Sequence, residues 1–131
     1  MRPGPIPIAF FAATLSASLS ALAQNSAPHP HVAVSTDAAQ WDRLPASGEL
    51  ASLYPQAALD QQAGARTAMT CRVQADGSLT SCALLEEIPR RFGFGRATIQ
   101  AAPFFRMRSR SPDGTPTEGQ NVRISLEWSA R

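Results

Sequence analysis

The chain has 131 residues, which is enough for one modest domain and too few for two of ordinary size. Hydrophobic residues make up 44% and charged residues 17%, a balance that excludes a disordered polyelectrolyte, a collagen-like repeat and a long coiled coil. The net charge of +2 comes from 12 basic and 10 acidic residues spread along the chain, so the sequence carries no basic footprint for nucleic acid.

The amino terminus has the features of a secretory signal peptide in their usual order. Arg2 supplies a positive charge, an apolar run follows from Ile6 to about Leu15, and Ala21-Leu22-Ala23 offers a cleavage site. We therefore expect residues 1–23 to be removed and the protein to be periplasmic. The alternative is a retained single anchor in the inner membrane, which at this length would barely span a bilayer.

Residues 24–40 contain Ser, Ala, Pro and His without clear periodicity, and we interpret them as a flexible linker. His29 and His31 lie in this stretch, but two histidines without a further ligand at a definable spacing do not predict a metal site. The folded domain is expected over residues 41–131.

Two short helices are expected in this domain. The first begins at Tyr54-Pro55, because proline favours the first helical turn, and ends at Gly64, a typical C-cap residue. The second runs from about Gly95 to Ala102, where Pro103 interrupts it.

Strands alternate with these helices, which indicates a small α+β domain. Residues 65–75 and 79–88 are expected to pair as a hairpin around Asp76-Gly77. The last strand has the clearest alternation in the chain, with four apolar residues expected to face the core: Val122, Ile124, Leu126 and Trp128. The expected order is therefore helix, two strands, helix and strand, and a short additional strand before the first helix is compatible with it.

The two cysteines flank the hairpin. If Asp76-Gly77 are the two loop residues, Cys71 lies directly opposite Cys82, from where a disulfide can form. We therefore predict a Cys71–Cys82 disulfide, since an exported chain enters an oxidising compartment. A three-residue loop would shift the register by one residue and turn the thiols to opposite faces. The spacing fits neither a C-x-x-C redox pair nor a four-ligand zinc site.

The expected domain lacks the usual catalytic constellations. No histidine occurs in residues 41–131, which removes Ser-His and Cys-His pairs. Glu86 and Glu87 are neighbours on a strand and point to opposite faces, so they do not form an acid–base pair. Gly93-Phe94-Gly95 lacks the third glycine of a dinucleotide loop. The sequence therefore predicts no enzyme, no cofactor and no metal site.

A series of short motifs follows along residues 41–128: Trp41-x-x-x-Pro45, Tyr54-Pro55-x-x-Ala58, Gly64, Cys71-x-Val73, Asp76-Gly77-x-Leu79, Cys82, Glu87-x-Pro89, Gly93-Phe94-Gly95-x-Ala97, Phe105-Arg106-Met107, Asp113-Gly114-x-Pro116 and Val122-x-Ile124. Together these motifs resemble the TonB C-terminal domain, in the cysteine-pair variety of the energy transducer TonB family. The resemblance implies an α+β fold in which two helices pack on one face of a three-stranded antiparallel sheet.

The resemblance also implies a function in TonB-type envelope transport. The last strand would be an unpaired edge to which a partner, such as the TonB box of an outer-membrane receptor, adds a strand. The residues of this expected partner-binding edge are Asn121, Val122, Arg123, Ile124, Ser125, Leu126 and Glu127. Of the amides of Arg123 and Ser125, only one is expected to point outward to the partner.

Two departures limit what the resemblance implies. Full transducers have a membrane anchor and a long Pro-rich spacer, whereas residues 24–40 reach at most about 60 Å. Pro103 also breaks the second helix where the family usually continues it. The alternative function is a structural envelope module that docks on peptidoglycan or a membrane complex without strand addition or energy transduction. Pairing of two copies through the same edge is the homodimeric alternative.

Overall fold

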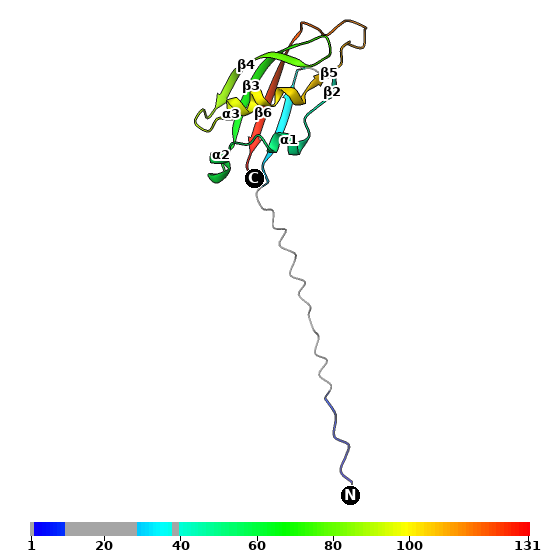
Figure 1. Ribbon diagram of the computed structural model, residues 1–131. Helices are drawn as coiled ribbons and strands as arrows, with labels where there is room; N and C mark the ends of the chain where they lie inside the picture. The colour runs from blue at the N-terminus through cyan, green and yellow to red at the C-terminus, as the bar shows by residue number, and fades with distance from the viewer. Residues whose placement is uncertain (1, 10–28, 38–39) are drawn as a thin grey trace.

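The computed structural model describes residues 2–9, 29–37 and 40–131 (Figure 1). The predicted cleavage site after Ala23 and most of the apolar run before it lie outside the described residues. Within those ranges, no helix is long and apolar enough to cross a membrane.

A four-stranded antiparallel sheet in the order β1-β6-β3-β4 forms the centre of the fold. Its strands are β1 (His31–Thr36), β3 (Ala65–Val73), β4 (Leu79–Ile88) and β6 (Asn121–Ser129). A second sheet pairs β2 (Trp41–Arg43) with β5 (Arg106–Met107). The α+β class agrees with the expectation, but the three-stranded sheet is corrected to four strands.

The additional strand, β1, comes from the segment interpreted as a linker. Its side chains alternate between the core and solvent: Val32 and Val34 pack against the core, and the residues between them are exposed. β-branched residues suit such a half-buried strand. The linker prediction is therefore wrong for residues 31–36.

The helical segments are short. They are α1 (Ser47–Ala51), α2 (Gln56–Asp60), α3 (Phe94–Gln100) and the 3₁₀ helix η1 (Ala102–Phe104). α2 and α3 fall where the two helices were expected, and α1 is an addition. Pro103 lies in the first turn of η1, directly after α3, which agrees with the predicted interruption.

Helices and sheet share one hydrophobic core. Leu50 of α1, Ala58 of α2 and Phe94 of α3 belong to the same buried cluster as the inward side chains of the sheet. In β6, the inward residues are at most 3% exposed: Val122, Ile124, Leu126 and Trp128. The predicted core face of the last strand is thus confirmed.

The β3–β4 hairpin differs from the predicted one in its loop. The N–H of Gln74 donates to the carbonyl of Ser78 at 2.8 Å, and Val73 lies opposite Leu79. The loop therefore has three residues, 75–77, and the predicted two-residue loop is wrong. Gly77, with φ of +87°, supplies the left-handed position that such a loop requires.

A second irregularity in β4 brings the cysteines together. The register shifts between the pairs Arg72–Thr80 and Thr70–Ala83, and Ser81 in this interval has φ of +52°. The extra residue cancels the shift made by the longer loop, because each moves the pairing by one position. Cys71 and Cys82 consequently lie with their Cα atoms 4.1 Å apart and form the predicted disulfide.

Gly77→Ala is expected to destabilise the fold more than Gly114→Ala does. Both glycines have φ of +87°, so alanine strains both backbones by about 1 kcal/mol. A Cβ at Gly114 meets no atom within 4 Å, whereas a Cβ at Gly77 would collide with the carbonyl oxygen of Met107. We expect a total loss of about 2 kcal/mol for Gly77→Ala, measured by urea denaturation. Equal losses in the two variants would contradict the close approach of the hairpin tip to β5.

Candidate partner-binding edge

β6, the predicted partner-binding strand, lies inside the sheet. It pairs with β3 from Asn121 to Trp128 and with β1 from Ile124 to Ser129. Figure 1 shows β1 (cyan) beside the red ribbon of β6. The unpaired edge expected along β6 is therefore not present in this structure, because the chain's own β1 covers it.

The hydrogen bonds on either side of β6 show which backbone groups face β1. The N–H of Val73, in β3, donates to the carbonyl of Gln120 at 2.9 Å. The N–H of Arg123 instead donates to the Asp37 carboxylate at 3.1 Å, directly after β1. Successive residues of a strand point their backbone groups to alternate sides. The odd-numbered residues of β6, including Ser125 and Glu127, therefore direct their backbone groups toward β1.

This alternation corrects the expectation for Arg123 and Ser125. The two residues are two positions apart in one strand, so their amides point to the same side, not to opposite sides. Both face β1. Proline at either position would remove a donor from the β1 side of β6 and none from the β3 side.

The side chains of the odd-numbered residues lie on the face of the sheet away from the core. Asn121, Arg123 and Glu127 are exposed, and Ser125 is half-buried. Arg123 approaches Glu86 of β4 across this face, with Nη2 and Oε2 4.0 Å apart. A strand placed on the β1 side of β6 would therefore meet polar and charged side chains on one face and the core on the other.

Sequence reasoning missed the residues that cover this edge. Residues 31–36 pair with β6, and Asp37 closes the pairing through both its carboxylate and its N–H, which donates to the carbonyl of Arg123 at 3.4 Å. The signal in the sequence was the alternation Val32-x-Val34-x-Thr36, hidden by its Pro- and Ala-rich surroundings.

The outer side of β4 is the other long edge of the sheet. Three apolar side chains are exposed near its end: Leu84 at 40%, Leu85 at 50% and Ile88 at 57%. The register of β4 shifts at two places, near Ser81 and near Leu85. Such irregularities break the regular row of backbone groups that an added strand needs, so β4 is the less suitable edge.

Glu86 and Glu87 point to opposite faces, as predicted. Glu86 approaches Arg123 on the open face, while Glu87 accepts a hydrogen bond from the N–H of Gly95, in the first turn of α3, at 2.8 Å. Glu87 thus holds α3 against β4. The two elements are so close at Gly95 that a Cβ there would collide with the side chains of Leu84 and Glu87. The two carboxylates serve different structural contacts.

A cleft of about 490 Å³ lies beside the hairpin, with Arg72, Asp76 and Glu118 as its charged lining residues. Asp76 accepts hydrogen bonds from the N–H and hydroxyl of Ser78, which lower the pKa of its carboxyl. Its carboxylate is therefore engaged in the hairpin turn. Among the described residues, no group of three or more His, Cys, Asp or Glu residues could hold a metal ion. That the protein is not an enzyme stays a prediction.

Comparison with solved structures gives partial similarity. No protein-family model and no curated protein matches the chain. Among solved structures, a match is the TonB2 protein from Vibrio anguillarum, at 19% sequence identity and a TM-score of 0.47. The match covers 60% of this chain and 73% of the TonB2 chain.

Proposed function

We propose that the protein is a periplasmic protein-binding module of the TonB type. It would pair the outer side of β6 with an extended segment of an envelope protein, such as the TonB box of an outer-membrane receptor. The ordered motifs over residues 41–128 support the choice of family. The proposal places the partner strand where β1 lies in this structure.

The observation that carries the proposal is the way in which β6 is covered. Its outward backbone groups face a six-residue strand, and none of the side chains of that strand is buried. On its other side, β6 pairs with β3, whose residues Met69, Cys71 and Val73 are at most 1% exposed. A strand that contributes so little to the core can be replaced by another without loss of the core, which is the requirement for β-strand addition.

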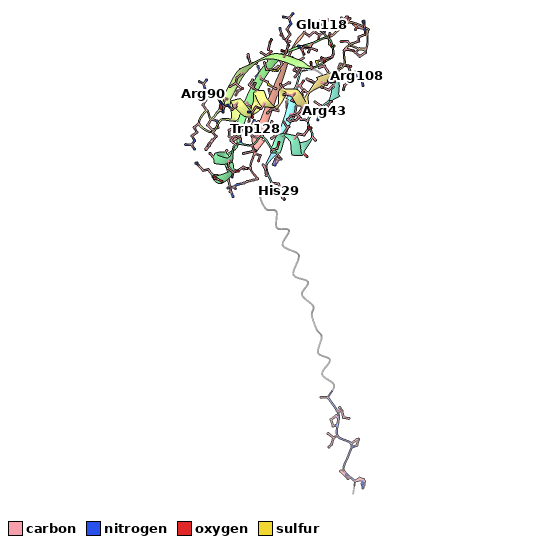
Figure 2. The ribbon with its side chains drawn as sticks, viewed as in Figure 1. His29, Arg43, Arg90, Arg108, Glu118 and Trp128 are labelled. Atoms are coloured by element: carbon pink, nitrogen blue, oxygen red, sulfur yellow. A yellow bond between two sulfur atoms is a disulfide. The ribbon has the colours of Figure 1, made fainter. Side chains whose placement is uncertain are left out.

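Crosslinking in cells tests this proposal. A photoreactive residue in place of Glu127, which is exposed and lies opposite Ala33 of β1, is expected to capture an envelope protein through an extended segment. The matched control carries the same photoreactive residue in place of Arg90, which is exposed beyond the end of β4 (Figure 2). Mass spectrometry of the adduct identifies the captured segment. Capture from position 90 alone would contradict binding at β6.

The second candidate function is a structural envelope module that docks without strand addition. The specific observation in its favour is that β1 already covers β6. This function predicts that β1 stays in place while the partner is bound, whereas the proposed function requires β1 to leave.

A further inference from the structure

We propose that β1 is a displaceable self-strand, that is, a strand of the protein's own chain that occupies the partner's place on β6. Its residue pattern then indicates the pattern required of the partner segment. The partner segment would be extended, about six residues long and antiparallel to β6, with β-branched or other apolar side chains at alternate positions. This inference rests on the proposed function, since it names the ligand chemistry and the regulation of the same edge.

The register between β1 and β6 defines the required pattern. Val32 lies opposite Trp128, and Val34 lies opposite Leu126. Because these β6 residues are core residues, the two valines cover the edge of the core. A strand that replaces β1 must cover the same edge, so its inward positions must be apolar.

The opposite face of β1 sets a weaker requirement. Ala33 lies opposite Glu127 and Ser35 opposite Ser125, with all but Ser125 exposed. Small or polar residues therefore suit the outward positions. Selectivity would come from the inward side chains, while the backbone hydrogen bonds would supply affinity whatever the sequence.

Asp37 ends the pairing with two contacts to the backbone of Arg123. Its carboxylate oxygen accepts the N–H of Arg123 at 3.1 Å, in the position that a strand carbonyl would take. The accompanying backbone bond to the carbonyl of Arg123 is long, at 3.4 Å. An incoming strand that extends past this point can supply a regular carbonyl and amide to Arg123 in place of these contacts.

The loss of β1 leaves the rest of the core assembled. Among the described residues, all of the fully buried large side chains lie outside β1, on β3, β6, the helices and the loops. β1 contributes two half-buried valines and packs beside α1. β6, β3 and β4 remain paired with one another after β1 has left. Partner binding then competes with β1 for one place, so the apparent affinity equals the intrinsic affinity multiplied by the fraction of molecules in which β1 has left.

Two variants change this competition in opposite directions. Ser35→Cys with Ser125→Cys locks β1, because these residues are paired in register on the open face. Hydrogen-bonded antiparallel pairs have Cα atoms about 5.5 Å apart, which suits a disulfide. Ala33→Pro opens β1, because it removes an N–H directed at β6. The matched controls are the single Ser35→Cys variant and Ala33→Ser, which keeps the N–H.

The probe is a fluorescent synthetic peptide with the sequence of residues 30–37, and fluorescence anisotropy measures its binding to the full chain. We expect the Ala33→Pro variant to bind it about tenfold more tightly, or better, than the wild type and Ala33→Ser. The locked variant is expected not to bind it, and the Ser35→Cys control to bind like the wild type. The same peptide with Val32→Ser and Val34→Ser is expected not to bind any variant. Circular dichroism confirms that each variant is folded.

Equal binding by the opened, wild-type and locked proteins would overturn the inference, and so would the absence of binding to a folded Ala33→Pro variant. The proposed function fails separately. If the peptide replaces β1 as expected but position 127 captures no envelope protein, the self-strand stands and the proposed partner class falls. If position 127 captures the same protein in the locked variant, binding does not require β1 to leave, and the inference falls.

Discussion

Trp128→Ala is expected to lower the free energy of unfolding by about 3–5 kcal/mol, the largest loss among single truncations in β6. The indole is 2% exposed; it packs edge-on against Tyr54, with ring centroids 5.6 Å apart, and in a tilted arrangement against Phe94, at 5.4 Å. Its Nε1–H donates to the hydroxyl of Thr67 at 3.0 Å. The substitution therefore removes the residue on which β3, β6 and α3 meet.

Urea denaturation followed by circular dichroism measures this loss without relying on the tryptophan itself. Trp128→Phe keeps most of the ring contacts and loses the N–H, so it is expected to lose about 1–2 kcal/mol. Glu127→Ala, at the exposed neighbouring position, is the control and should change stability little. A Trp128→Ala variant as stable as Glu127→Ala would contradict the position of Trp128 in the core.

Removal of the disulfide, by Cys71→Ala with Cys82→Ala, is expected to lower the free energy of unfolding by about 2–3 kcal/mol. The bond joins residues 11 positions apart, a short loop, so the constraint on the unfolded chain is modest. Cys71 is 1% exposed and belongs to the core, and alanine at this position also leaves a small void.

Denaturation of the double variant beside the reduced wild type separates these two effects. The reduced wild type loses only the covalent constraint, so it should lie between the oxidised protein and the double variant. Mass measurement without reductant should show the wild type two hydrogens lighter than its reduced form. If reduction left the unfolding midpoint unchanged, the disulfide would not contribute to stability.

The parts of the fold that the sequence predicts well are those with a long and regular pattern. The alternation from Val122 to Trp128 identifies both the strand and its buried face, because four large apolar residues at every second position fit one face of a strand and do not fit one face of a helix. Pro103 likewise marks the end of α3 correctly, since proline cannot continue the helical hydrogen bonds.

The hairpin shows why a correct contact can follow from a wrong register. The sequence Asp76-Gly77 fits both a two-residue loop and the last two positions of a three-residue loop, and local preference does not distinguish them. The compensating shift at Ser81 has no signature in the sequence, because serine is rarely found in the left-handed conformation. The disulfide was predicted for the right pair on the assumption of a regular ladder that the structure does not have.

The candidate site was only half predictable. The pattern of β6 indicates the strand, but whether its outer side is free depends on a segment 88 to 98 residues earlier in the chain, as the pairs Thr36–Ile124 and His31–Ser129 show. Val32 and Val34 are too few to stand out among alanine, serine and proline. Pairing with β6 makes this short segment a strand, so tertiary context decides where local preference is weak.

The direction of β1 also determines how the sheet responds to tension. His31 lies opposite Ser129, so the chain enters β1 beside its own carboxyl-terminal residues, at one end of the sheet (Figure 1). A force that pulls these two ends apart would act first on the pairing between His31 and Ser129 and then on each following pair in turn. Strands loaded in shear must break their hydrogen bonds together, whereas β1 can be peeled from β6 one pair at a time. The pairing of β1 with β6 is therefore the mechanically weakest in the sheet, and it lies where a partner strand would bind.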